Sequence, residues 1–183
     1  YEHEGAALFE KYGIPVPVRQ VVQSVDEPIT IAMPVVVKAQ VLTSDRKRAG
    51  GIVFPKSKKE LQVAVAQLLD KRIKGERVRA VMIAQKITAI AEYYASFSYD
   101  TQSRSPVLAV SIFGGTGTET AHVFPIDMTV GLLPFMVRDM LVRAGFPSVD
   151  IPGVAAVVQN LWKVFINEPA TLVEINPILK TAE

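Results

Sequence analysis

The chain alternates short apolar segments of strand-like character with amphipathic segments of helical period. Residues 35–41 form a β-branched run that is interrupted by Lys38, which is typical of a buried strand. Residues 52–54 are expected to return as the partner strand, after a loop over residues 43–51. The pattern therefore predicts a hairpin with a lysine inside its first strand.

Four amphipathic segments are predicted to be helices. The first carries its apolar residues on one face, and Gly13 is placed to end it in a left-handed conformation. Ser57 is placed to cap the second helix, and Glu60 completes a capping box three residues later. We expect these helices over residues 1–13, 58–72, 133–144 and 154–165.

Further strands are predicted from apolar and β-branched runs bounded by turn residues. They cover residues 78–85, 92–99, 107–113 and 172–175, with Pro177 closing the last. Residues 100–106 are expected to turn the second and third of these strands into a hairpin. This order of elements predicts an α/β (α+β) fold with mostly antiparallel strands rather than a run of βαβ units.

Composition narrows the class of protein. Hydrophobic residues make up 49% of the 183 residues and charged residues 21%, a balance typical of a globular domain. The formal net charge of +2 is too small to indicate a nucleic-acid or membrane partner. The absence of cysteine excludes disulfides and thiolate metal sites, and the two histidines exclude a histidine-rich metal site. We expect a cytoplasmic location, or the mitochondrial matrix in a eukaryote.

Three side chains stand out for their chemistry. Glu174 and Asn176 lie two residues apart on one strand and hence on one face, and both offer the oxygen ligands that Mg²⁺ prefers when it is shared with nucleotide phosphates. An Asn-Pro pair after a strand is also ordinary turn chemistry. Lys38 needs an anionic partner if its strand is buried, and a nucleotide phosphate would suit it. The alternative is a lysine on the solvated face of a half-buried strand.

Five segments, in the same order, resemble the ATP-grasp portion of the succinyl-CoA synthetase (succinate–CoA ligase) β subunit, within the acyl-CoA synthetase (NDP-forming) superfamily. The most specific is LVEINPILKT, residues 172–181. The others are YEHEGAALFEKYGIPVP (1–17), PVVVKAQ with the following RAGG (34–40 and 48–51), EYYASFSYDTQSRSPVLAVSIFGG (92–115) and PIDMTVGLLPFMVRDMLVRAGF (125–146).

The resemblance implies an ATP-grasp fold of two lobes over residues 1–183, with the small lobe inserted at about 34–84. It implies that ATP or GTP is a substrate, that Mg²⁺ is the cofactor, and that phosphoryl exchange takes place with a phosphohistidine on a CoA-binding α subunit. That exchange would be coupled to formation of succinyl-CoA, as in the tricarboxylic acid cycle. The family continues beyond this stretch into a strand with an acidic metal ligand and a CoA-ligase domain, so we expect further chain after Glu183.

The resemblance also assigns roles residue by residue. Glu174 corresponds to the glutamate on the phosphate path to the histidine and is the expected catalytic residue, and Asn176 corresponds to a Mg²⁺ ligand. The expected nucleotide-binding residues are Lys38, Arg46, Gly50, Gly51, Gln85 and Glu92.

The chain departs from the family pattern at several positions. Asp45 and Lys47 stand where glycines are usual, and side chains there keep phosphates further from the backbone. Ala84 stands where the family has a glutamate, and Phe113 precedes a glycine turn that begins with glutamate in the family. His122 is expected to be structural or exposed. These departures leave open the alternative of a non-catalytic ATP-grasp module that scaffolds or regulates an assembly. A citrate- or malate-activating CoA ligase is a further alternative, because such relatives share the same nucleotide half.

Overall fold

The computed structural model describes residues 1–43, 46–115 and 120–182. The chain forms two compact units: unit 1 is Tyr1–Ala7 with Pro15–Ile87, and unit 2 is Leu8–Ile14 with Thr88–Glu183. Helix α1 (Glu2–Lys11) contributes its first residues to unit 1 and its last residues to unit 2. All strand pairs of the described residues are antiparallel, which confirms the predicted fold class.

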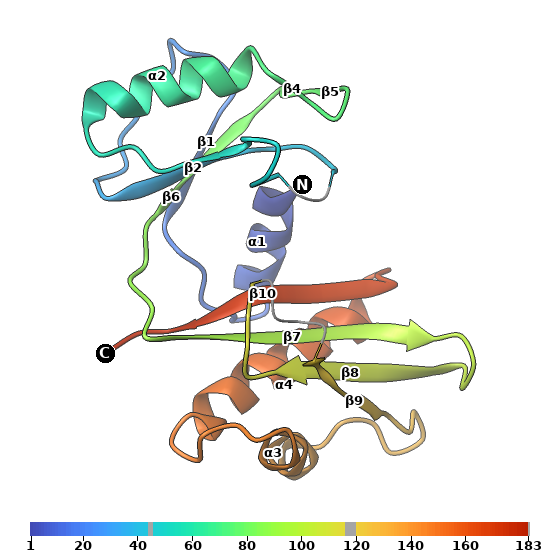
Figure 1. Ribbon diagram of the computed structural model, residues 1–183. Coiled ribbons are helices and arrows are strands. Elements are labelled where there is room, and N and C mark those ends of the chain that lie inside the picture. Colours follow the sequence, from blue (N-terminus) through green and yellow to red (C-terminus); the bar gives the residue numbers. More distant parts are fainter. Residues whose placement is uncertain (44–45, 116–119, 183) are drawn as a thin grey trace. The chain divides into compact units, whose positions relative to one another are not determined.

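Unit 1 is built on a four-stranded sheet. Its elements are β1 (Arg19–Val22), β2 (Val35–Ala39), β3 (Ile52–Val53), α2 (Lys58–Leu69), β4 (Arg72–Ile73), β5 (Glu76–Arg77) and β6 (Val81–Gln85). The sheet has the order β1-β6-β2-β3, and β4 and β5 form a separate small hairpin. Helix α2 covers one face of the larger sheet (Figure 1).

Side chains alternate across β2, and this alternation decides what each face of the sheet carries. Val35 and Val37 are buried in the core that the sheet shares with α2. Lys38 lies on the opposite face, directly across from Ile52 on β3 and Met82 on β6. The predicted hairpin with a lysine inside its first strand is confirmed. Val35, Val37 and Ala39 enter the core shared with α2, whereas Val36 and Lys38 do not.

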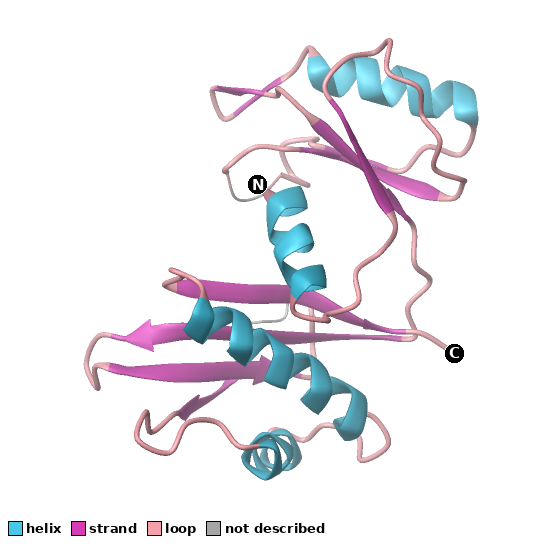
Figure 2. Cartoon of the chain, turned by 180° about the vertical axis from the view of Figure 1, so that it is seen from behind, coloured by secondary structure: helices cyan, strands magenta, loops and turns pink. Residues whose placement is uncertain are grey.

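Unit 2 is built on a second four-stranded sheet, of order β10-β7-β8-β9. Its elements are β7 (Ala91–Asp100), β8 (Ser105–Ser111), β9 (His122–Pro125), α3 (Pro134–Arg143), α4 (Ile151–Asn167) and β10 (Leu172–Lys180). Helix α4 runs across one face of this sheet (Figure 2) and packs against Phe97 through Trp162 and Phe165. In the described part of the chain, no helix is long and apolar enough to cross a bilayer.

A carboxylate ties three elements of unit 2 together. Asp150, the residue before α4, accepts a hydrogen bond from the Tyr93 hydroxyl of β7 at 2.5 Å, and its other oxygen lies 2.5 Å from Nζ of Lys180 on β10. Lys180 and Tyr93 together hold the pKa of Asp150 below its ordinary value. Burial, followed by the hydrogen bond to Asp150, raises the pKa of Tyr93 to about 12.

Helix α2 is shorter than predicted. Ser57 does cap it, since its hydroxyl accepts from the Glu60 N–H at 3.2 Å, but the Glu60 carboxylate accepts from the backbone of Lys56 instead of Ser57. The helix ends at Leu69 rather than at residue 72, because residues 72–77 form the β4–β5 hairpin. Lys74 and Gly75 have φ of 48° and 87° at its turn, a conformation that Gly75 signals in the sequence.

The last strand is longer than predicted. Pro177 was expected to close it, yet β10 continues to Lys180. The register shifts between Ile175, which pairs with Ala95, and Ile178, which pairs with Tyr93, so the strand carries one extra residue at this point. The irregularity accommodates a proline that has no N–H to donate. Strands β1 and β9 were not predicted, and β6 begins at residue 81 rather than 78.

Candidate functional site

Lys38 has an anionic partner within its own unit. Its Nζ lies 2.6 Å from Oε1 of Glu2, in the first turn of α1, and its side chain is 27% exposed. Arg46, in the loop after β2, places Nη2 2.6 Å from the other oxygen of Glu2. One carboxylate thus holds two cations, one on each oxygen. Lys38 and Arg46 were predicted from the sequence as nucleotide-binding residues, whereas Glu2 was not predicted to belong to the site.

Glu2 is ionised by its surroundings. Burial by itself would raise the pKa of Glu2, but the Lys38 ammonium and then the Arg46 guanidinium outweigh it and hold that pKa below its usual range. The three side chains carry two positive charges and one negative charge. The cluster therefore keeps a net charge of about +1, which suits an anionic ligand.

Backbone contacts fix the same cluster. Nη1 of Arg46 donates to the Ala39 carbonyl at 3.3 Å. Gln40, which is 2% exposed, donates from Nε2 to the Lys38 carbonyl at 3.2 Å, and its Oε1 accepts from the backbone N–H of His3 at 3.1 Å. Residues 2 and 3 of α1 are therefore bonded directly to β2 and to the loop that follows it.

Gly50 and Gly51 are required by the backbone of this loop. Gly50 has φ of 67°, and its carbonyl accepts from Nζ of Lys71 at 3.0 Å. A Cβ on Gly51 would lie 2.7 Å from Cδ1 of Ile73 and 3.1 Å from the Arg46 carbonyl. Their roles toward a nucleotide stay predictions. Lys47 is exposed, and Asp45 lies outside the described residues.

Gln85 ends β6 as an exposed residue, and its backbone N–H donates to Val18 at 2.8 Å. The preceding Ala84 is 5% exposed and packs with Val36 and Met82. Strand pairing places Val36, Ala84 and Met82 on the same sheet face as Lys38. Lys38 therefore shares this face with an apolar cluster of Val36, Met82 and Ala84.

In unit 2, Glu174 lies on the sheet face that α4 leaves uncovered. It pairs across the sheet with Ser96 of β7, while its neighbours Val173 and Ile175 contribute to the helix-covered core. Its Oε2 lies 3.3 Å from the Tyr94 hydroxyl, which is also 2.9 Å from the hydroxyl of Ser96. Glu174 is exposed, so its carboxylate is accessible to a ligand.

Asn176 holds the turn after β8. Its Oδ1 accepts from the Gly115 N–H at 2.6 Å, and its Nδ2 donates to the Gly115 carbonyl at 3.2 Å. Glu92 is exposed near the start of β7, and its Oε2 would lie 3.6 Å from a Cβ on Gly115. The fold thus brings Glu92, Gly115 and Asn176 together. The rest of the glycine turn, residues 116–119, lies outside the described residues.

The donors in unit 2 suit a shared metal ion better than one held by protein alone. No group of three or more histidine, cysteine, aspartate or glutamate side chains that could hold a metal occurs among the described residues. The Oδ1 of Asn176 has a second lone pair beyond the one used by Gly115, and Asn176 is an exposed residue. Such a donor fits Mg²⁺ that takes most of its oxygens from phosphates and water.

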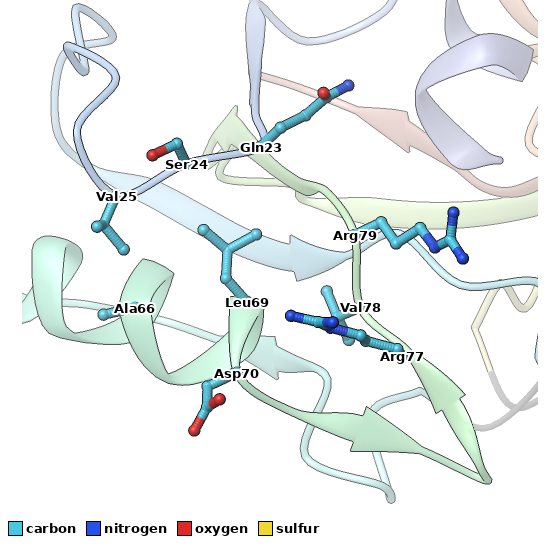
Figure 3. Close-up of a pocket in the computed structure, with 9 residues that line it drawn as sticks. All are labelled: Gln23, Ser24, Val25, Ala66, Leu69, Asp70, Arg77, Val78 and Arg79. Atoms are coloured by element: carbon cyan, nitrogen blue, oxygen red, sulfur yellow. The ribbon is translucent and has the colours of Figure 1, made fainter.

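A separate hollow of about 510 Å³ lies on unit 1, near the end of α2 (Figure 3). Its two arginines, Arg77 and Arg79, point in opposite directions and do not converge on one ligand position (Figure 3). None of the residues singled out from the sequence lines it. The lining residues are Gln23, Ser24, Val25, Ala66, Leu69, Asp70, Arg77, Val78 and Arg79.

The profile of the ATP-grasp domain matches residues 1–180 of the chain. The sequence is 35% identical over 193 residues to the succinate–CoA ligase [ADP-forming] subunit beta of Methanocaldococcus jannaschii. That match covers 100% of this chain and 53% of the relative, so the chain spans about half the length of the curated relative it matches.

Solved structures show the same fold. A structure of the dinucleotide-forming acetyl-coenzyme A synthetase 1 of Ca. Korarchaeum cryptofilum, in complex with coenzyme A and Ca-AMPCP, matches with a TM-score of 0.80 and 17% identity, over 99% of this chain and 86% of that chain. A second structure of that enzyme, with a phosphorylated phosphohistidine segment, has a TM-score of 0.76 at 18% identity, over the same shares of both chains. The expected ATP-grasp architecture is confirmed.

Proposed function

Because the chain belongs to the ATP-grasp domain family, we propose that it is the nucleotide-binding part of an acid–thiol (CoA) ligase that forms ADP or GDP. The reaction would exchange a phosphoryl group between the Mg-nucleotide and a phosphohistidine on a CoA-binding α-type subunit. Succinate is the first choice of acid, since the relative named above is a succinate–CoA ligase. Citrate- and malate-activating ligases are the alternative.

The observation that carries the proposal is the cation pair of unit 1. Lys38 and Arg46 each lie 2.6 Å from the same carboxylate, so both cations are held at one place on the sheet face opposite α2. Lysine has three donors and arginine has five, so both keep donors for a second anion. A polyphosphate is the ligand class that two adjacent cations of this kind recognise.

Unit 2 supplies the residues proposed for the transfer itself. Glu174 is exposed and bonded to Tyr94, which leaves its other oxygen for a histidine ring that accepts or delivers the phosphoryl group. A carboxylate beside an imidazole raises its basicity and orients it. Asn176 and Glu92 would meet the metal and the nucleotide. When bound, Mg²⁺ would supply charge neutralisation of the polyphosphate.

Isothermal titration of Mg-ADP and Mg-GDP into the full-length protein tests this function. We expect saturable binding to the wild type and a loss of at least about tenfold in Lys38→Ala, because one of two phosphate cations is removed. Lys59→Ala, an exposed lysine on α2, is the matched control and should bind like the wild type. The stronger of the two titrations gives the base preference.

Absence of binding by the wild type at millimolar nucleotide would overturn the proposal. It would favour the alternative of a non-catalytic ATP-grasp module that scaffolds or regulates an assembly. The buried Ala84, where the resembled family carries a glutamate, is the described feature that this alternative explains best.

A further inference from the structure

Among the residues that the structure describes, Glu2 is the acidic residue that contacts both cations of the proposed phosphate site. Its two oxygens each lie 2.6 Å from a different cation, and its side chain is 29% exposed. It belongs to the first turn of α1, far from Lys38 and Arg46 in the sequence. The contact therefore depends on the tertiary fold, which places the first residues of the chain in the same unit as β2.

Without a carboxylate between them, the two cations would repel each other and would keep many rotamers. Lys38 lies on the same sheet face as Val36 and Met82, which offer no polar partner. Both long side chains, those of Lys38 and Arg46, lose conformational entropy when they are ordered. Glu2 places one oxygen at ion-pairing distance from each cation, so it offsets that repulsion and restricts both head groups. Arg46 is fixed a second time by the Ala39 carbonyl.

The first turn of α1 is itself held in place. The neighbouring residue, His3, donates its backbone N–H to the buried Gln40, and its ring nitrogen Nδ1 lies 2.9 Å from the same oxygen. Glu2 is thus not a free surface side chain that meets two cations by chance. Its backbone is anchored next to β2 by bonds that do not involve its own carboxylate.

We propose that Glu2 is a positioning residue for nucleotide binding: it orients the Lys38 ammonium and the Arg46 guanidinium toward the polyphosphate without touching the nucleotide itself. This inference rests on the proposed function and adds a residue to it. The arrangement follows the same logic as the helix–strand glutamate–lysine pair that must be in place in protein kinases. A carboxylate that only occupied the cations until an anion arrived would act in the opposite direction.

Titration of Mg-ADP into Glu2→Gln distinguishes the two behaviours. A positioning residue predicts that affinity falls by about tenfold, the usual effect of losing a residue that orients a ligand-binding group. Glu2→Asp keeps the charge, but its side chain is one methylene too short to reach both cations. Its affinity for Mg-ADP should therefore lie between those of the wild type and Glu2→Gln. Glu4→Gln, an exposed glutamate of the same helix, makes the same charge change and should bind like the wild type.

Adenosine, followed by NMR, provides the readout that a merely structural role would not share. It lacks phosphates, so its affinity should be the same in wild type and Glu2→Gln if the protein is intact. Equal losses for adenosine and Mg-ADP would overturn the inference, because they would mean general damage to the site. So would a Glu2→Gln variant that binds Mg-ADP as tightly as the wild type or more tightly, or a Glu2→Asp variant that equals the wild type.

These outcomes are separable from failure of the proposed function. If the wild type binds no Mg-ADP, the proposed function is overturned, and the role of Glu2 falls with it. If the wild type binds and only the Glu2 variants disagree with expectation, the nucleotide site stands and the positioning role alone is wrong.

Discussion

The side chain of Asn176 binds the backbone of Gly115 with both of its polar atoms, accepting from the N–H at 2.6 Å and donating to the carbonyl at 3.2 Å. The two residues lie 61 positions apart in the sequence, on β10 and in the turn after β8. An asparagine expected to serve a metal ion thus already has a structural task. These two hydrogen bonds join β10 to the glycine turn that follows β8.

Asn176→Ala should loosen this turn. Both hydrogen bonds are lost, and because the site is exposed we expect a fall of only about 1 kcal/mol in the free energy of unfolding. Amide hydrogen exchange at Gly115 should accelerate, since its N–H loses its acceptor. Urea unfolding and exchange measured by NMR would check both effects, and unchanged exchange at Gly115 would contradict the expected hydrogen bond.

Gly114→Ala should destabilise unit 2 more strongly. A Cβ there would lie 2.7 Å from Cβ of Pro177 and 2.9 Å from the Tyr93 carbonyl, so backbone would have to move. We expect a loss of about 2 kcal/mol in the free energy of unfolding. Gly153→Ala in α4 is the matched control, because a Cβ there meets nothing within 4 Å, and it should stabilise by roughly 0.5 kcal/mol.

Tyr93 should make stability fall at alkaline pH. Its pKa is raised to about 12 in the folded protein, against an ordinary value near 10, so between these values the unfolded chain releases a proton that the folded protein keeps. The stabilisation is complete below about pH 10 and disappears as pH rises to about 12. Unfolding measured from pH 9 to 12 should show the advantage of wild type over Tyr93→Phe shrinking across this window.

Arg46 and Lys47 should differ in their effect on nucleotide binding, although they are neighbours. Arg46 forms an ion pair with Glu2 and donates a hydrogen bond to the Ala39 carbonyl, whereas Lys47 is exposed. We expect Arg46→Ala to weaken Mg-ADP binding by about tenfold or more and Lys47→Ala by less than about threefold, with the smaller effect vanishing in salt. Titration at two salt concentrations checks this, and equal losses would place the phosphates at the loop tip instead.

Tyr94 should support Glu174 in phosphoryl transfer. Its hydroxyl lies between Ser96 and Glu174, at 2.9 and 3.3 Å, and burial is the main cause of its raised pKa. In the assembled enzyme we expect Glu174→Gln to abolish phosphoryl exchange while leaving Mg-ADP binding intact. Tyr94→Phe should lower exchange by about threefold to tenfold. Exchange of labelled ADP into ATP measures both, and a loss of nucleotide affinity in Glu174→Gln would contradict the assignment.

The sequence predicted elements well where periodicity and caps agreed. The Ser57 cap, the lysine-bearing β2 strand and the β7–β8 hairpin were all expected and are all present. It failed where the deciding interaction is long-range. Strand β1 is four residues long and contains Arg19 and Gln20, and it exists because it pairs with β6.

The candidate site shows the same division. Lys38, Glu174 and Asn176 could be named from residue type and strand parity, and the fold places each on an accessible sheet face or turn. Glu2 could not be found, because no local pattern reveals that a helix-initial glutamate pairs with residues 36 and 44 positions away. Tyr94 was missed for a similar reason, since its relation to Glu174 depends on the register of β10 against β7.

The extra residue in β10 has a consequence for how the two ends of that strand are tied to the sheet. Between its pairs with Ala95 and Tyr93 the strand advances three residues while β7 advances two, so inside–outside parity is set independently on either side of Pro177. Val173 and Ile175 follow one phase, and Ile178 begins another. A change in length at this point would alter the presentation of Asn176 without turning the core residues of either half toward solvent. The position of Asn176 in β10 can therefore change without disturbing the core packing that keeps unit 2 folded.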